Sequence, residues 1–495
     1  MAQYQALISN IIILLIYIVL MVSVGLYCMK KAKNVDGFLL GGRNFGPWLS
    51  AFAYGTSFFS AVIFIGYAGK NGWNLGISAV WIGIANALIG CLVSWLVLAK
   101  RTRMMTHKLD AKTMPEFFES RYQDKRMKIF CAIIIFIFLT PYAASVYMGL
   151  SYLFSAVFPR VPYIWWMVIM ATLTALYLTL GGYMATVLTD FIQGLIMIVG
   201  IVLVVYFVMT NPVVDGLKNG LRQLGQIPDV GSDLTHPFGG RNWFDLLSLS
   251  VLTSLGTWGL PQMVHKFYTV KAGNSIRQAA IISTLFALLI GGAAYFIGAF
   301  GRLFLQNQVP AEGFDAVMPQ MLNMALPSVM MGVVLVLILS ASMSTLSSVV
   351  MTSSSSLTID LVKGHFAPNM SDRDTVGLMR ILCVVFVGLS FAIAAFKPKE
   401  IITLMSFSWG TVAGTFIGPY VWGLYDKKVT KIGAWSGMIC GFLTSIVPAV
   451  VSGFNAQFAP TFGMLAMFVS LLITPIVSRY TPGYDTEFIK GIFEE

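Results

Sequence analysis

The stretch VLILSASMSTLSSVVM, residues 336–351, begins as an apolar membrane span and becomes a series of hydroxyl groups without any charge. Ser344, Ser347 and Ser348 are spaced i, i+3 and i+4. Thr345 precedes Ser348 by one helical turn, so on a helix all four hydroxyls share one face. Such hydroxyls usually bond to carbonyls of their own helix or bridge to a neighbouring helix. A cluster this dense could also ligate a small, hard cation such as sodium, and the stretch alone leaves both interpretations open.

The composition places this stretch in a membrane protein. Of the 495 residues 57% are hydrophobic and only 11% are charged, far from the average of a soluble domain. Apolar runs of about 18 residues or more, long enough to cross a bilayer, recur along the whole chain. We therefore predict an all-α polytopic membrane protein with about thirteen transmembrane helices. The predicted spans are roughly 8–29, 49–69, 77–99, 128–157, 163–181, 184–209, 244–264, 278–303, 328–361, 379–396, 400–424, 432–452 and 462–478.

The basic residues indicate how these spans are oriented. With the N-terminus outside, the connections that face inward hold about three quarters of the 32 Lys and Arg residues. This bias predicts a multi-pass protein of the cell (inner) membrane with a cytoplasmic C-terminus. The net charge of +11 is thereby explained by topology, and it does not indicate a nucleic-acid partner.

Two spans contain residues that interrupt helices. Span 49–69 carries Gly55-Thr56-Ser57 near its middle, and span 244–264 carries several glycines and Pro261. Each of these spans is the first of a group of five consecutive spans. Because five is an odd number, the second group crosses the membrane in the opposite direction to the first. Broken helices at matching positions of two inverted repeats are typical of secondary transporters, with the solute held at the interruptions.

This pattern divides the chain into five parts. We expect an N-terminal helix and cytoplasmic turn (1–45), a first inverted repeat (46–210), an external loop (211–243), a second inverted repeat (244–425), and two C-terminal helices with a tail (426–495).

Asp190 is the one deep charge that the span assignment identifies. Of the 21 acidic residues it alone falls clearly inside an apolar span, because Asp245 and Asp360 lie at span ends. A carboxylate in a membrane is costly unless it is paired or binds a cation, so a functional role is the default hypothesis. A structural hydrogen bond near the inner interface is the alternative. Gly181-Gly182, just before it, predicts a tight inner turn, and segment 110–125 predicts a short amphipathic helix on the inner membrane face.

Six short segments, in this order, span nearly the whole chain: GGRNFGPW (41–48), YGTSFFSA (54–61), GGYMATVLTDFIQG (181–194), GLPQMVHKF (259–267), SASMSTLSS (340–348) and KIGAWSGMICG (431–441). Each segment is short, but the ordered set resembles the sodium/solute symporters, a family with a leucine-transporter-like fold. Within that family the set looks most like bacterial proline and pantothenate carriers.

The resemblance implies a set of ligands for sodium, the only cofactor expected. The common sodium site would take the carbonyl oxygens of Thr56, Phe59 and Ala341 with the hydroxyls of Ser344 and Thr345. A second sodium site, found in some sialic-acid members, would combine Asp190 with the hydroxyls of Ser344, Ser347 and Ser348, and all four residue types are present.

The solute site departs from the patterns that the resemblance implies. Phe58 stands where proline carriers have an aspartate, and Thr253 and Thr257 stand where they have Trp and Tyr. The fourth span lacks the arginine of the best-known sialic-acid carriers. Solute contact is expected from residues at or beside the helix breaks, namely Phe58, Ser60, Tyr142, Thr253 and Thr257.

Together these features predict a sodium-coupled importer of a small polar organic solute, an amino acid or organic carboxylate, working by alternating access as a monomer in the bilayer. Sialic acid or a sugar as solute, or coupling to protons, are alternatives within the same fold. A channel or solute sensor is the alternative outside it, but a channel needs a continuous polar pore. No span holds a His/Asp/Glu cluster, so we do not expect an enzyme.

Overall fold

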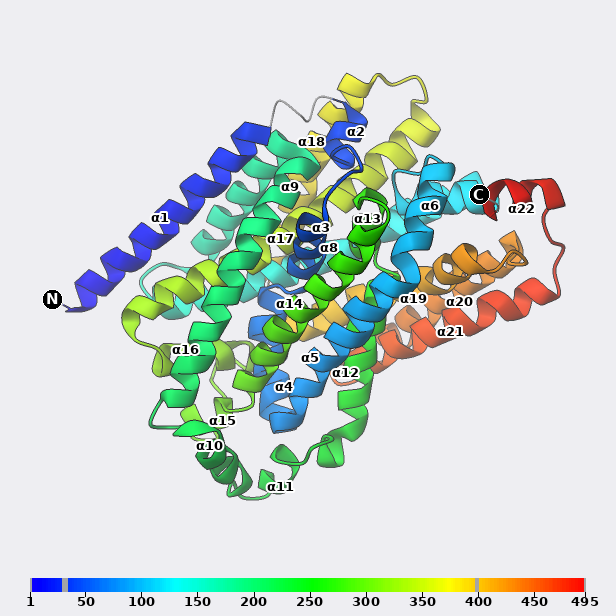
Figure 1. The fold of residues 1–495 in the computed structure, drawn as a ribbon. Coiled ribbons are helices and arrows are strands. Elements are labelled where there is room, and N and C mark those ends of the chain that lie inside the picture. The colour runs from blue at the N-terminus through cyan, green and yellow to red at the C-terminus, as the bar shows by residue number, and fades with distance from the viewer. Residues whose placement is uncertain (1, 29–33, 397–399, 494–495) are drawn as a thin grey trace.

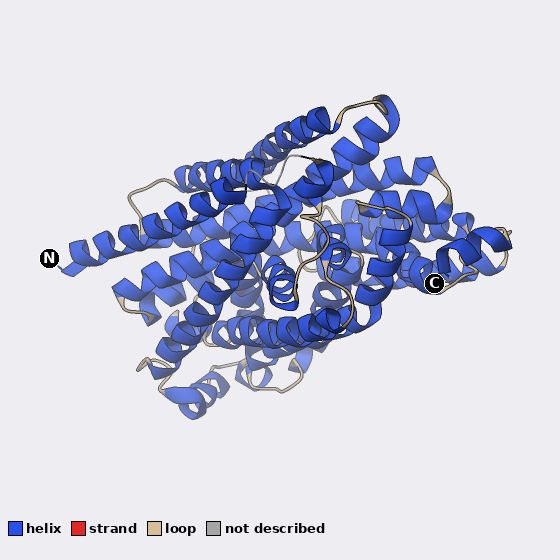
Figure 2. Ribbon diagram, turned by 45° about the horizontal axis from the view of Figure 1, so that its top comes forward, coloured by secondary structure: helices blue, strands red, loops and turns tan. Residues whose placement is uncertain are grey.

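The computed structural model describes residues 2–28, 34–396 and 400–493, and these residues form helices and loops without any strand (Figure 2). Ten of the described helices are long and apolar enough to cross a membrane. The all-α prediction is therefore confirmed. The predicted end of the first span at residue 29 lies outside the described residues.

The first half of the chain begins with α1 (Ala2–Cys28), which lies at the edge of the molecule (Figure 1). Many of its apolar side chains are exposed. The elements that follow are α2 (Val35–Leu39), α3 (Pro47–Phe58), η2 (Val62–Tyr67), α4 (Ala68–Leu75), η3 (Gly76–Ala79), α5 (Val80–Ala85), η4 (Asn86–Val93), η5 (Trp95–Ala99), α6 (Lys100–Lys108), α7 (Met114–Tyr122), α8 (Lys125–Val157) and α9 (Tyr163–Thr210). Within α9, Gly182 has φ 58°, so two helices meet there, as the Gly181-Gly182 pair predicts.

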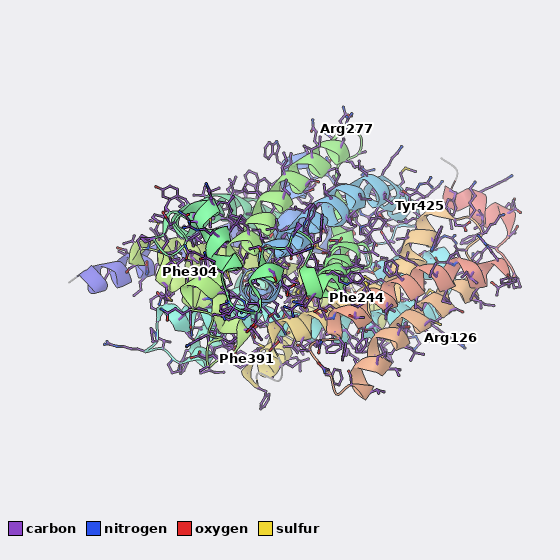
Figure 3. The ribbon with its side chains drawn as sticks, turned by 90° about the horizontal axis from the view of Figure 1, so that it is seen from below. Arg126, Phe244, Arg277, Phe304, Phe391 and Tyr425 are labelled. Carbon is purple, nitrogen blue, oxygen red and sulfur yellow. The ribbon has the colours of Figure 1, made fainter. Side chains whose placement is uncertain are left out.

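The segment between α9 and α12 is the predicted external loop, and it contains the short helices α10 (Gly216–Gly225) and α11 (Gly231–Leu234) and the turn η6 (Gly240–Asn242). The remaining elements are α12 (Trp243–Leu255), η7 (Gly256–Trp258), α13 (Pro261–Thr269), α14 (Asn274–Gly298), α15 (Gly301–Phe304), η8 (Phe314–Ala316), α16 (Val317–Ala325), α17 (Ser328–Ser355), η9 (Ser356–Phe366), α18 (Asp372–Phe396), α19 (Ile401–Tyr425), α20 (Lys431–Val451), α21 (Ala459–Arg479) and α22 (Thr486–Phe493). Figure 3 shows Arg277 of α14 and Phe304 of α15 far apart, at opposite ends of one membrane crossing.

Both interrupted spans are broken in the structure. The first is divided into α3 and η2–α4, and the second into α12 and α13 with η7 between them. The helix continues through Gly55-Thr56-Ser57 and breaks at Phe59, a few residues later than these residues suggest. The second broken span continues to Thr269, five residues beyond its predicted end at 264.

The stretch 336–351 lies in α17, which is almost wholly enclosed by other helices. It packs against α9, α8, α1 and α3. The C-terminal helices α20 and α21 pack against α19 on the other side of the molecule (Figure 1). Small residues permit the close approach, since a Cβ on Gly441 would lie 2.0 Å from the Gly414 carbonyl oxygen.

One prediction about the inner surface is wrong in detail. Helix α7 does not lie on the membrane face as an amphipathic helix, because Phe117, Phe118 and Arg121 are all buried in the protein. Arg121 Nε donates a hydrogen bond of 2.9 Å to the Gly423 carbonyl. The aromatic rings of α7 pack against Tyr420 of α19, so protein contacts replace lipid contacts there.

Candidate sodium and solute site

The break in α3 exposes backbone groups to the middle of α17. Phe59 has extended backbone angles (φ −102°, ψ 112°), and the chain becomes helical again from Ala61. The Ser342 hydroxyl accepts a hydrogen bond of 3.1 Å from the Ala61 amide, which α3 no longer satisfies. Helix α17 is thus joined by a side chain to the point where the span is interrupted.

The predicted ligands of the common sodium site meet at this junction. Ser344 Oγ lies 2.7 Å from the Thr56 carbonyl oxygen and 3.0 Å from that of Ala341. Thr345 Oγ1 lies 3.2 Å from the Ala341 carbonyl oxygen and 3.2 Å from that of Ser57. Four of the five predicted groups therefore form one cluster, and the Phe59 carbonyl belongs to the adjacent break. The Ser57 carbonyl is an oxygen of the cluster that the sequence did not suggest.

The chemistry of this cluster fits a small monovalent cation. Its oxygens are neutral, and the residues that carry them are buried. Oxygen ligands lie roughly 2.3–2.6 Å from Ca²⁺, a cation of similar radius, so neighbouring ligands stand about 3.3–3.7 Å apart. The observed oxygen–oxygen distances of 2.7 to 3.2 Å are shorter, so the oxygens would have to move apart to surround an ion. Sodium would be held here once the two hydroxyls turn their protons away from the carbonyls.

Asp190 is not the only deep charge, and that part of the sequence interpretation is wrong. Lys266 of α13 is 2% exposed, and its Nζ lies 3.7 Å from Asp190 Oδ2. The predicted span ended at 264, two residues before this lysine, and so excluded it. Asp190 itself is fully buried on α9, and neither of its oxygens has a hydrogen-bond partner among the described residues.

The lysine also contacts the hydroxyls assigned to the second sodium site. Lys266 Nζ donates a hydrogen bond of 3.0 Å to Ser348 Oγ, which lies 2.8 Å from Ser57 Oγ. Ser347 Oγ donates to the Ser344 carbonyl of its own helix at 2.9 Å. The structure therefore brings Asp190 and Ser348 together through an ammonium group, and Ser347 bonds to its own helix.

Aromatic side chains lie beside the break. The Phe58 ring stacks on the rings of Phe59 and Trp409, with centroids 4.8 and 5.9 Å apart. Tyr142 of α8 makes an edge contact with Trp409 at 5.7 Å. The Tyr142 hydroxyl and the Trp409 indole nitrogen are buried and have no hydrogen-bond partner in the described structure, which makes them candidates for contact with a polar solute. Trp409 was missed from the sequence, although SFSWG (406–410) is a polar interruption of an apolar span.

The two predicted threonines face a different helix. Thr253 Oγ1 donates to Asn86 Oδ1 at 2.7 Å, and Thr257 Oγ1 donates to the Gly90 carbonyl at 3.1 Å. Phe58 packs against the same Gly90, where an added Cβ would meet its ring at 2.9 Å. Ser60 Oγ accepts from the Val62 amide at 3.2 Å. Thr253, Thr257 and Ser60 therefore have protein partners here, and their solute contact stays a prediction.

The ends of the two broken spans are joined near Lys266. The Phe45 amide donates to the Thr269 carbonyl at 3.1 Å, and the Lys271 amide donates to the Phe45 carbonyl at 2.9 Å. Arg103 Nε donates to the Val270 carbonyl at 2.7 Å. These bonds hold the end of α13 against the segment directly before α3.

Two broken helices with an oxygen cluster and a buried ion pair define a membrane transporter of the helix-break type. The chain belongs to the sodium:solute symporter family, whose sequence profile matches residues 38–441. It is accordingly a multi-pass membrane protein and a sodium-coupled solute symporter.

Similar proteins agree with this assignment. The sodium/proline symporter 2 of Staphylococcus saprophyticus is 30% identical over 100% of this chain and 98% of its own length. The sodium/proline symporter of Staphylococcus aureus is also 30% identical, over 96% of this chain and 94% of its own.

The fold is similar to that of a Na⁺-coupled sialic acid symporter in its substrate-bound outward-open state. Its TM-score is 0.78 at 18% identity, covering 96% of this chain and 99% of the other. The nucleobase-cation-symport-1 transporter Mhp1 in a closed conformation gives a TM-score of 0.56 at 14% identity, covering 92% and 97%. The leucine-transporter-like fold expected from the sequence is thereby supported.

Proposed function

We propose that the chain imports a small polar organic solute together with sodium by alternating access. The observation that carries this proposal is the cluster of Thr56, Ala341, Ser344 and Thr345 oxygens at the break of α3. A cation bound there contacts both α3 and α17, so it favours the arrangement in which the two helices are together. Coupling follows because sodium and solute each bind that arrangement better than the separated one.

The solute is an amino acid or organic carboxylate held between Phe58, Tyr142 and Trp409. The two unsatisfied donors, Tyr142 Oη and Trp409 Nε1, suit the oxygens of a carboxylate. Proline is the first candidate because both curated relatives are sodium/proline symporters. Phe58 stacks on Trp409 and, as an uncharged side chain, supplies no counterion for the amine of a solute. This favours solutes that are recognised mainly through their carboxylate and their apolar surface.

The proposal includes thirteen spans arranged as two inverted five-helix repeats with one N-terminal and two C-terminal helices. The helices support a count of thirteen, because α9 divides at Gly182 into two crossings and because the two pieces of each broken span are counted as one crossing. The N-terminus would lie outside and the C-terminus in the cytoplasm. A cysteine introduced at Gly483 should then react with a membrane-impermeant maleimide only from the inner side, with Gly216→Cys as the outer control.

An uptake screen in proteoliposomes tests the function. Labelled proline, other amino acids, organic carboxylates, sialic acid and sugars are compared under an inward sodium gradient, an inward proton gradient, or neither. Accumulation of one class under the sodium gradient alone supports the proposal. Accumulation driven by protons without sodium, or equilibration without any accumulation, would contradict it in favour of a proton-coupled carrier or a channel.

A further inference from the structure

We propose that the Lys266 ammonium takes the place of a second sodium ion, so that the chain binds one sodium and carries its second positive charge as a tethered group. The inference rests on the proposed function, since it concerns the ion stoichiometry of the same site. It replaces the second sodium site expected from Asp190, Ser344, Ser347 and Ser348.

The first step is the position of the charge. Lys266 Nζ lies between Asp190 Oδ2 at 3.7 Å and Ser348 Oγ at 3.0 Å, which are an anion and a hydroxyl of the expected site. The group is buried at 2% exposure, and the Tyr183 ring centroid lies 5.2 Å from it. An ammonium here has the charge of sodium and a carboxylate partner, but it cannot leave the protein.

The second step is that this site does not fit an additional cation. Asp190 is the only carboxylate paired with Lys266 among the described residues, so a sodium ion beside the ammonium would leave two positive charges facing one negative charge. One of the expected hydroxyls is also occupied, because Ser348 Oγ accepts a hydrogen bond from the ammonium itself. Like charges at such distances repel strongly in a buried setting.

The third step is that α9 is held close enough for the pair to form. A Cβ on Gly194, one turn after Asp190, would lie 2.0 Å from the ring of Phe52 on α3. Lys266 itself sits on α13, whose end is bonded to Phe45 beside α3. The ammonium therefore connects α9, α13 and α17, as a bound ion would.

Equilibrium binding of radioactive sodium alone to the purified full-length protein tests the inference. We expect about one sodium per chain in the wild type, with a Hill coefficient near 1. Lys266→Met should free Asp190 and Ser348 for a second ion and raise both numbers towards 2. The double variant Asp190→Asn/Lys266→Met should return them to about 1, and Lys266→Arg should keep the wild-type values.

Two ions in the wild type would overturn the inference while leaving the sodium symporter intact. A folded, monodisperse Lys266→Met protein that still binds one ion would also overturn it. If Lys266→Met does not fold, the wild-type count decides: about one ion supports the inference and two ions overturn it. Absence of any sodium binding in the wild type would instead refute the common sodium site, which Ser344→Ala probes separately.

Discussion

The Ser344 hydroxyl lies 2.7 Å from the Thr56 carbonyl oxygen, although 288 residues separate the two in the chain. The contact joins the middle of α17 to the last turn of α3, directly before its break at Phe59. The contact therefore exists only while the two helices are together, and the sodium ion that we propose at this place would contact both of them.

Removing either hydroxyl of the common site should weaken sodium binding. Ser344→Ala or Thr345→Ala should raise the sodium concentration for half-maximal uptake about 3- to 10-fold, the effect of losing one ligand or hydrogen bond. Expression should barely change, because a hydroxyl in a span contributes only about 0.6 kcal/mol. Uptake as a function of sodium concentration measures the effect.

Ser354→Ala is the matched control for these variants. Ser354 is a buried serine of the same helix, but its hydroxyl donates to the Val350 carbonyl at 2.8 Å and lies away from α3. It should retain wild-type sodium dependence. Unchanged sodium dependence in both site variants would remove the assignment.

Tyr142→Phe should weaken solute binding more than sodium binding. Its hydroxyl is buried without a partner, so the fold loses little when it is removed, while a bound solute loses one hydrogen bond. We expect the solute concentration for half-maximal uptake to rise about 2- to 10-fold. Tyr147→Phe, on the same helix, should leave uptake unchanged. A larger change in sodium affinity than in solute affinity would contradict this role.

Asp315, outside the spans, should make stability depend on pH. Burial raises its pKa to about 6, and Glu400 adds to the effect, although the Ile401 amide donates a hydrogen bond of 3.1 Å to the carboxylate. The folded state thus holds a proton that the unfolded state has lost above about pH 4. The contribution of Asp315 to stability is therefore most favourable below about pH 4 and is lost as pH rises from about 4 to about 6.

Asp315→Asn should remove this pH dependence and raise the melting temperature at pH 7. The gain is at most roughly 3 kcal/mol, since each pKa unit corresponds to about 1.4 kcal/mol. The amide oxygen can still accept from Ile401. Thermal unfolding in detergent from pH 4 to 7 measures the effect, with Glu312→Gln, an exposed neighbour, as control. An identical profile for wild type and Asp315→Asn would disprove the coupling.

Gly298→Ala should destabilise the fold. An added Cβ would lie 2.2 Å from the Ala68 carbonyl oxygen, so α14 would have to move away from α4. Overpacking of this kind costs about 1–3 kcal/mol. Gly292→Ala, on the same helix, meets no atom within 4 Å and should be neutral. Equal melting temperatures for the two variants would show that the helices separate without cost.

Much of the fold could be predicted from the sequence because a bilayer allows few solutions. Apolar runs give the spans, and Gly256, Gly259 and Pro261 locate the second break. The first break is at Phe59, where the sequence has neither a proline nor a glycine that would indicate it. There the backbone is held by tertiary contacts, such as the Ser342 hydroxyl on the Ala61 amide.

The sequence singled out candidate site residues where their chemistry or a family resemblance marks them. Asp190 stands out as a carboxylate in an apolar span, and Ser344 and Thr345 stand out through the resemblance; their sodium roles stay predictions. Lys266 was missed because hydropathy ended its span two residues early, and a basic residue near a span end suggests an interface. Its pairing with Asp190, 76 residues away, depends on how α13 packs, which local sequence does not encode. Trp409 was missed although SFSWG (406–410) interrupts an apolar span, because its contacts with Phe58 and Tyr142 depend on how the helices pack.

The tethered ammonium of Lys266 has an energetic consequence for the gradient this carrier can sustain. A sodium ion moving inward across 100 mV releases about 2.3 kcal/mol, and each tenfold sodium ratio adds about 1.4 kcal/mol. A lysine side chain returns with the protein in every cycle, so its displacement across the field cancels and contributes no net work. If only one sodium ion is transported per solute molecule, the solute concentration ratio can rise in proportion to the sodium ratio. With two ions it could rise with the square of the sodium ratio. In exchange, the cell re-exports only one sodium for each solute molecule gained.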